Sequence, residues 1–168
     1  MADLIRLVKQ AQAGDKEAFI DLIEHCKQAL YKTAIAMLKN DADAADAIQD
    51  TVLKCYENLR GLREPRFFKT WLTRILINQC KKIMKQRRNV VPLYEHPELE
   101  CEGTDTSQGE FLELLNQLEE QYRIVLYLHY VEEFSVKEIG VILELNENTV
   151  KTRLSRGRTK LKKIYCFE

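Results

Sequence analysis

The sequence predicts an all-α protein made of two small helical domains joined by a flexible linker. Gly and Pro are scarce, six and three in 168 residues, so the chain lacks the residues that would form the many turns of an all-β protein. Leu, Ile, Ala, Lys and Glu are abundant, and this composition favours helices. Apolar residues recur at steps of three and four along most of the chain, which is the period of an amphipathic helix.

The N-terminal part is expected to hold four helices. The first runs from about Leu4 to a break at Gly14, and Asp15 is a suitable N-cap for the second. Asn40 and the residues after it supply the cap of a third helix, which reaches about Leu59.

A loop over residues 61–66 precedes the fourth helix, and Pro65 restricts the backbone near its end. The apolar stripe of this helix consists of Phe67, Phe68, Trp71, Leu72, Ile75, Leu76, Cys80, Ile83 and Met84. Its far end is basic and carries Lys81, Lys82, Lys85, Arg87 and Arg88. Rings beside cations suit unpaired nucleic acid, but most of these rings also fit a core. We therefore expect the loop and the face bearing Asn78, Lys81 and Lys82 to be free for DNA.

The helical period stops between residues 90 and 109. This stretch holds two of the three prolines together with several acids and small polar residues, which is the composition of a linker. We therefore place an N-terminal domain at residues 1–89, an acidic flexible linker at residues 90–109 and a C-terminal domain at residues 110–168.

The C-terminal domain is expected to end in a helix-turn-helix. Helical spacing resumes at Phe111, and Ser135 with Glu138 then matches the capping box of a new helix. That helix is short and ends near Leu143, and Asn146 can cap a last helix that reaches about Tyr165. Two helices joined by such a tight turn form the unit that many proteins use to enter the major groove of DNA.

Charge is unevenly distributed along the chain, although the net charge is zero. Residues 1–90 carry 17 Lys or Arg against 11 Asp or Glu, residues 91–134 carry 1 against 11, and residues 135–168 carry 8 against 4. Two basic ends suit a protein that meets a polyanion at two places. A single charge run can equally solvate a helix face, so the positions of the cations must decide between this interpretation and binding to a polyanion.

Cations dominate the last predicted helix. Its inward face is expected to consist of Val150, Leu154, Gly157, Leu161 and Ile164. Its other faces carry Lys151, Arg153, Arg156, Arg158, Lys160, Lys162 and Lys163. Thr149, Thr152 and Ser155 lie among the first of these cations, where a recognition helix touches base edges. A basic surface helix or a partner-binding helix is the alternative, and the short helix before it favours the DNA-binding interpretation.

The sequence predicts no catalytic, metal or cofactor site. The five cysteines are scattered and include no Cys-x-x-Cys pair, which indicates reduced thiols in a cytosol. His25 and Cys26 are adjacent, but neighbouring side chains on a helix do not face each other. No nucleophile with a base and no Gly-rich phosphate loop occurs. No secretory or membrane-spanning segment is recognisable, so we expect a cytoplasmic protein without membrane contact of its own.

Three stretches resemble the extracytoplasmic-function (ECF) group of bacterial RNA polymerase sigma factors, within the sigma-70 family. They are Asp-Ala-Ile-Gln-Asp-Thr-Val at 46–52, Phe-Lys-Thr-Trp-Leu-Thr-Arg-Ile at 68–75 with Asn78, and Asn-Thr-Val-Lys-Thr-Arg-Leu-Ser-Arg-Gly-Arg at 148–158. Their order and separation are more specific than any one of them, and the resemblance covers nearly the whole chain. A linker in place of a third domain indicates the ECF group.

The resemblance implies core RNA polymerase and promoter DNA as partners, with residues 1–89 as sigma domain 2 and residues 110–168 as sigma domain 4. The clamp of the largest polymerase subunit would be bound by Asp46, Gln49 and Asp50. The opened strand of the −10 element would be bound by Arg63, Glu64, Arg66, Phe67, Asn78, Lys81 and Lys82. The −35 duplex would be bound by Asn148, Thr149, Lys151, Thr152, Arg153, Ser155, Arg156 and Arg158. An anti-sigma factor that occludes both domains is implied as well.

A free-standing helix-turn-helix regulator, which binds operator DNA without polymerase, is the competing hypothesis. It explains the basic last helix equally well. It gives no reason for the polar face of Asp46, Gln49 and Asp50 or for the basic, aromatic loop before the fourth helix. The sigma-factor hypothesis explains all three features.

Overall fold

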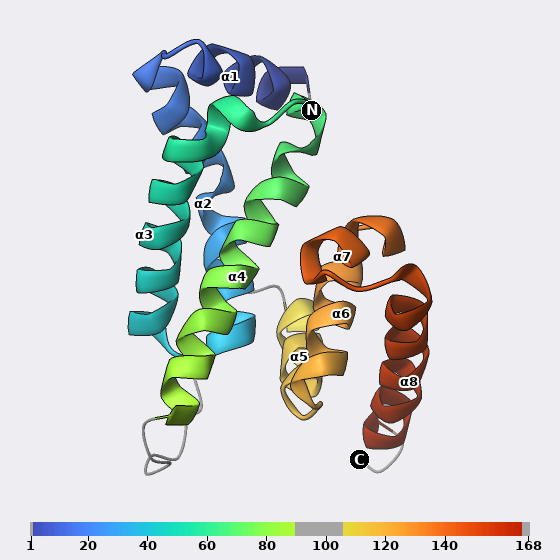
Figure 1. Ribbon diagram of the computed structural model, residues 1–168. Helices are drawn as coiled ribbons and strands as arrows, with labels where there is room; N and C mark the ends of the chain where they lie inside the picture. Colours follow the sequence, from blue (N-terminus) through green and yellow to red (C-terminus); the bar gives the residue numbers. More distant parts are fainter. Residues whose placement is uncertain (1, 90–105, 166–168) are drawn as a thin grey trace. The chain divides into compact units, whose positions relative to one another are not determined.

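The computed structural model describes residues 2–89 and 106–165 and divides the chain into two compact units, with the division between Glu95 and His96 (Figure 1). Every element within the described residues is an α-helix or a short 3-10 helix, which confirms the all-α prediction. The expected linker at 90–109 lies outside the described residues except for its last four positions.

The N-terminal unit contains the α-helices α1 (Ala2–Gln12), α2 (Lys16–Leu38), α3 (Asp41–Asn58) and α4 (Phe68–Asn89). Two of the predicted caps are confirmed. The side chain of Asp15 accepts a hydrogen bond from the backbone N–H of Ala18, and that of Asn40 accepts one from Asp43. In Figure 1, α1 lies across one end of the bundle formed by α2, α3 and α4.

The core of the N-terminal unit forms where α3 and α4 pack against each other and against α2. Small residues of α3, such as Ala44 and Ala47, are fully buried and let the helices approach closely. Phe68 and Leu72 of α4 are also buried, whereas Trp71 is only half-buried. The face of α4 opposite this core is therefore available for other contacts.

The segment between α3 and α4 is more regular than the predicted loop. It contains two 3-10 turns, η1 (Leu59–Gly61) and η2 (Pro65–Phe67). Pro65 occupies the first position of η2, where its missing N–H costs no hydrogen bond. The side-chain amide of Gln12 donates to the carbonyl oxygens of Leu59 and Leu62, at 3.0 and 2.8 Å. This segment is therefore held against α1 rather than left loose.

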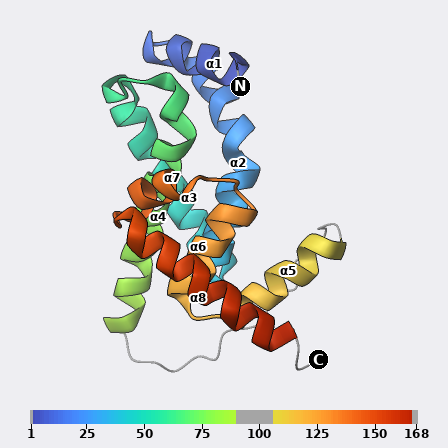
Figure 2. The same cartoon turned by 90° about the vertical axis from the view of Figure 1, so that its right-hand side faces the viewer.

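The C-terminal unit contains α5 (Thr106–Asn116), α6 (Glu120–Tyr130), α7 (Val136–Leu143) and α8 (Glu147–Tyr165). Helix α5 begins four residues before position 110, where sequence analysis starts the domain. Its first turn, Thr-Ser-Gln-Gly, has no apolar residue, so hydrophobic periodicity could not detect it. In Figure 2, α8 runs in front of α6, against which it packs.

The helix-turn-helix consists of α7 and α8. Ser135 and Glu138 form the predicted capping box at the start of α7. Glu144, with a φ of 58°, ends α7 in the left-handed conformation, and the N–H of Leu145 donates to the carbonyl of Gly140 at 2.9 Å. A Cβ atom at Gly140 would lie 2.8 Å from the carbonyl oxygen of Leu145, so the turn is close enough to require glycine there.

The packing of α8 on α6 also depends on a glycine. A Cβ atom at Gly157 would lie 2.9 Å from Cδ1 of Leu126, so the two helices approach closely at this point. Val150 and Leu154 on the same face of α8 are buried, as predicted, whereas Leu161 and Ile164 are only half-buried. In the part of the chain that the structure covers, no helix has the length and apolar character needed to cross a membrane.

Candidate nucleic-acid interface

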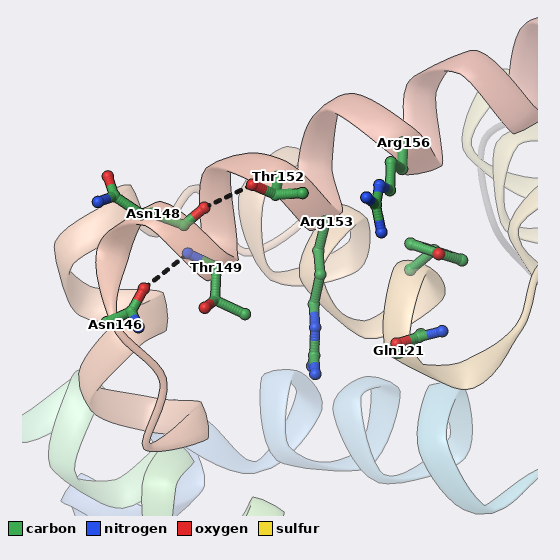
Figure 3. A pocket seen from close by; sticks show the side chains of 8 residues that line it. Gln121, Asn146, Asn148, Thr149, Thr152, Arg153 and Arg156 are labelled. Atoms are coloured by element: carbon green, nitrogen blue, oxygen red, sulfur yellow. Dashed lines mark hydrogen bonds between the residues drawn. The ribbon is translucent and has the colours of Figure 1, made fainter.

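An open hollow lies beside the N-terminal half of α8, with a volume of about 470 Å³. Its lining residues come from α8, from the turn before it and from the first turn of α6. They are Gln121, Tyr122, Asn146, Asn148, Thr149, Thr152, Arg153 and Arg156 (Figure 3). The structure thus brings five of the eight predicted duplex-binding residues to one hollow.

Local hydrogen bonds order the α8 side of the hollow. Asn146 caps α8 as predicted, because its Oδ1 accepts from the N–H of Thr149 at 2.8 Å. The hydroxyl of Thr152 donates to the carbonyl of Asn148 at 2.9 Å (Figure 3). Since this bond uses the single proton of the hydroxyl, Thr152 can offer DNA an acceptor and a methyl group but no donor.

Arg153 and Arg156 supply the positive charge of the hollow. Figure 3 shows both side chains on the same side of α8, while Gln121 projects from α6 into the space beside them. Neither arginine forms an ion pair within the described residues. Their guanidinium groups therefore remain available to a phosphate or to a base edge.

Three of the predicted duplex-binding residues, Lys151, Ser155 and Arg158, do not line the hollow, although all three are exposed. Arg158 follows Arg156 by two residues, which turns it about 200° around the helix. Its guanidinium carbon lies 5.8 Å from the centroid of the Tyr130 ring. Arg158 therefore occupies the opposite flank of α8 from Arg156.

The predicted −10 residues of the η2 segment form a small exposed group. The Nε of Arg66 lies 3.4 Å from the carboxylate of Glu64, and its guanidinium carbon lies 4.8 Å from the centroid of the Phe67 ring. The Phe67 side chain is 47% exposed, so one ring at this site is open to stacking. Arg63 is exposed nearby in the chain.

The remaining −10 residues lie further along α4. Asn78 is half-buried, whereas Lys81 and Lys82 are exposed, and their spacing of three and four residues puts them on one face. Phe67 precedes Asn78 by eleven residues, which corresponds to about 16 Å along a helix. These residues therefore form a stripe along α4 and do not meet in one pocket. Arg87 is engaged elsewhere, in an ion pair with Asp43.

The predicted polymerase-binding residues Asp46, Gln49 and Asp50 are all exposed on α3. Sequence reasoning missed Leu53, which follows Asp46 by seven residues and Asp50 by three and so shares their face. Its side chain is 57% exposed. The signal was present in the spacing, because an apolar residue on an otherwise polar face stands out.

Sequence reasoning also missed Gln121 and its neighbours. Glu119 forms a hydrogen-bonded salt bridge with Lys160. The hydrogen bond is the main cause that lowers the pKa of Glu119 and raises the pKa of Lys160. The ammonium of Lys160 also lies 5.0 Å from the centroid of the Tyr122 ring. No local sequence pattern links residues that are about forty positions apart.

The described cysteines, Cys26, Cys55 and Cys80, are free thiols. Burial raises the pKa of Cys26 to about 11 and that of Cys55 and Cys80 to about 12. The other two cysteines lie outside the described residues. Within the described ranges, no cluster of His, Cys, Asp or Glu has the arrangement to hold a metal ion.

Comparison with known proteins decides the family. Residues 22–90 match the model of sigma-70 region 2, and residues 108–161 match that of sigma-70 region 4. The chain is 33% identical to the ECF RNA polymerase sigma factor SigW of Bacillus subtilis over 93% of both chains. The chain belongs to the ECF family of RNA polymerase sigma factors. The ECF sigma-E factor of Escherichia coli K12 is a more distant relative, 25% identical over 90% of this sigma factor and 88% of its own length.

Solved structures agree with this assignment. The sigma factor RpoE of Bartonella quintana, in complex with the anti-sigma factor NepR, matches with a TM-score of 0.72 and 25% identity over 88% of this chain and 96% of that one. CnrH in complex with the cytosolic domain of CnrY has the same fold, with a TM-score of 0.74 and 24% identity over 99% of both chains. Sigma factors are transcription initiation factors and not enzymes, which confirms the prediction of a non-catalytic chain.

Proposed function

We propose that this sigma factor attaches to core RNA polymerase through α3 and directs it to promoters that it contacts at two places. The observation that carries the proposal is the presence of two different surfaces on two compact units. One unit exposes a polar and apolar face on α3, and the other exposes a basic hollow on α8. A free-standing DNA-binding regulator would need only the second surface.

Asp46, Gln49 and Asp50, together with Leu53 at the C-terminal end of the same face, are the proposed contacts for the clamp of the largest polymerase subunit. An exposed leucine beside polar side chains suits a protein interface, which combines apolar and polar contacts. The buried residues on the opposite face of α3 keep the helix in place. This surface is therefore suited to a protein partner rather than to DNA, whose phosphates would repel its carboxylates.

The exposed group around η2 and the stripe on α4 are the proposed contacts for the opened −10 strand. Extruding a base from a duplex costs a few kcal/mol. Stacking on an aromatic ring contributes about 1–3 kcal/mol per base, so the exposed Phe67 ring can offset much of this cost. Arg63, Lys81 and Lys82 are placed to follow the backbone of the same strand.

The exposed and hollow-facing residues of α8 are the proposed contacts for the −35 duplex. A recognition helix reads bases mainly with its N-terminal residues, and Asn148, Thr149 and Thr152 occupy that part of α8. The arginines beside them can reach both bases and phosphates. We further propose that the protein acts in the cytoplasm, where the polymerase and the promoter are found.

An anti-sigma factor is the proposed inhibitor. The solved complex of RpoE with the anti-sigma factor NepR supports this, because that protein is 25% identical to the chain over most of its length. Occlusion of the α3 face and of the α8 hollow together would prevent both polymerase binding and promoter binding. Promoter-specific transcription should then fall as the inhibitor is added and recover when more sigma factor is supplied.

A gel-shift experiment with and without core polymerase separates the proposal from the regulator hypothesis. We expect weak duplex binding by the chain alone and a promoter-specific complex when core enzyme is added. Asp50→Arg should abolish the association with core enzyme, because it reverses a charge on the proposed interface. Asp3→Arg makes the same change at an exposed position of α1 and should have little effect. Tight, sequence-specific binding by the chain alone would contradict the proposal.

A further inference from the structure

We propose that Gln12, the last residue of α1, is a positioning residue for the −10 contact. Gln12 holds the segment that carries Arg63 and Phe67, and it has no contact with DNA of its own. The inference rests on the proposed function, because it concerns the surface assigned to the opened strand. It goes further by giving α1 a role, since α1 ends at residue 12 whereas the match to sigma-70 region 2 begins at residue 22.

Two hydrogen bonds of Gln12 join α1 to the segment between α3 and α4. The side-chain nitrogen of Gln12 lies 3.0 Å from the carbonyl oxygen of Leu59 and 2.8 Å from that of Leu62. A carbonyl oxygen only accepts, so the amide donates one of its two protons to each of them. The carbonyl oxygen of Leu59 also accepts from the N–H of Leu62, at 3.1 Å. Gln12 thus binds the first residue of η1 and the residue that follows η1, directly before Arg63.

Helix α1 is well anchored and can support this contact. Val8 of α1 is fully buried, and α1 packs against α2 as well as against η1 and η2. Figure 1 shows α1 across the end of the bundle where the chain passes from α3 to α4. The hydrogen-bond geometry of a 3-10 turn is poorer than that of an α-helix. The segment with η1 and η2 therefore gains order from the helix beside it.

The ring of Phe67 is the group whose position Gln12 secures. This ring is 47% exposed, so the core does not hold it, and the N–H of Phe67 donates to the carbonyl oxygen of Glu64 at 3.0 Å. A segment that is ordered in advance loses less conformational entropy when a base arrives to stack on its ring. Without Gln12, the partly buried carbonyl oxygen of Leu62 would lose this donor, and the segment would shift to expose it to water. Gln12 thus raises the affinity for opened DNA by ordering the free protein.

Gln12→Met tests the proposal, because methionine keeps the length and helix propensity of glutamine but has no N–H donor. The full chain is assembled with core polymerase and a promoter template whose −10 region is already unpaired. We expect the affinity for this template to fall roughly tenfold, since two hydrogen bonds are lost. Gln10→Met is the matched control, because it makes the same change at an exposed residue of the same helix, and it should leave the affinity unchanged.

Rescue by another donor separates hydrogen bonding from a general effect of substitution. The ammonium of Gln12→Lys carries three donors on a flexible chain that is long enough to reach both carbonyl oxygens. A cation also suits the C-terminal end of a helix, where Gln12 lies. Gln12→Lys should therefore retain most of the affinity. Gln10→Lys measures what the added charge alone contributes.

A second substitution shows whether Gln12 acts through Phe67. Phe67→Ala should itself weaken binding to the unpaired template. Adding Gln12→Met to it should then change the affinity by less than about twofold, because coupled residues do not contribute independently. A residue that merely stabilises the domain would lower the affinity by the same factor in both backgrounds and would also weaken association with core enzyme. We expect Gln12→Met to associate with core enzyme as well as the unmodified chain does.

The inference is overturned if Gln12→Met and Gln10→Met bind the unpaired template alike, or if Gln12→Lys is as weak as Gln12→Met. It is also overturned if the full loss persists beside Phe67→Ala. Failure of the proposed function looks different, because Phe67→Ala alone would then bind the template as well as the unmodified chain does, and the role of Gln12 would be rejected with it. A weakened Phe67→Ala beside an unaffected Gln12→Met would reject the role of Gln12 alone.

Discussion

Substitution of Gly140 by alanine tests how the helix-turn-helix is built. The added Cβ would lie 2.8 Å from the carbonyl oxygen of Leu145, which is backbone and cannot rotate away. The same turn contains Glu144 in the left-handed conformation and the hydrogen bond from Leu145 to Gly140. The turn must therefore open, and the start of α8 must move with it.

The size of the effect follows from two opposing contributions. Forcing an extra carbon into a packed site costs about 1–3 kcal/mol, and a rigid backbone obstacle puts the cost near the upper end. Alanine in place of glycine within a helix stabilises the helix by about 1 kcal/mol. The C-terminal unit should lose about 2 kcal/mol, which lowers its thermal midpoint by roughly 10 °C for a domain of this size.

Two signals separate the units in this experiment. Trp71 is the single tryptophan, and it belongs to the N-terminal unit, whereas far-ultraviolet circular dichroism reports helices in both. Gly140→Ala should bring part of the dichroism transition to lower temperature and leave the tryptophan transition unchanged. Gly61→Ala is the control, because nothing lies within 4 Å of its added Cβ. A Gly140→Ala protein as stable as Gly61→Ala, or equal shifts of both signals, would refute the reasoning.

Three further predictions concern the α8 contacts, the α7 cap and the buried thiols. Arg156→Ala should weaken −35 binding by about 1–3 kcal/mol and leave core association unchanged, as measured by gel shift and by pull-down with core enzyme. Ser135→Ala removes the capping box and should cost the C-terminal unit about 1 kcal/mol in urea unfolding. Burial raises the pKa of Cys55 and Cys80 to about 12 in the folded protein, so the unfolded chain loses these thiol protons at a lower pH than the folded one. The stabilisation from the two protonated thiols is therefore fully present below about pH 8.5 and is lost as the pH rises toward 12. The urea midpoint followed by tryptophan fluorescence should show this fall, and Cys55→Ala should reduce it; an equal fall in both proteins would contradict the assignment.

Local features of the fold could be predicted from sequence because their causes lie within a few residues. Asp15, Asn40 and Ser135 each accept a hydrogen bond from an N–H three residues later, so cap and partner appear together in the chain. The left-handed residues were not predictable in the same way. Lys39 and Glu144 adopt positive φ as the C-caps of α2 and α7, and neither is the glycine or asparagine that usually indicates such a cap.

The site was less predictable where residues from distant helices meet. Helical spacing alone placed Arg153 and Arg156 on a face near the start of α8, but it could not show that Gln121 of α6 shares their hollow. It also treated Arg158 as equivalent to Arg156, whereas the structure places Arg158 beside Tyr130 on the other flank. Such differences arise from how α8 crosses α6, and a single sequence contains no direct signal of that crossing.

Transcription in vitro with purified core RNA polymerase tests the central claim most directly. Core enzyme with this protein should produce transcripts that begin at one defined position downstream of paired −35 and −10 elements, and neither component alone should do so. Mapping the start sites on several templates would then yield the promoter consensus. A protein that binds duplex DNA tightly by itself and adds no specific initiation to core polymerase would contradict the claim.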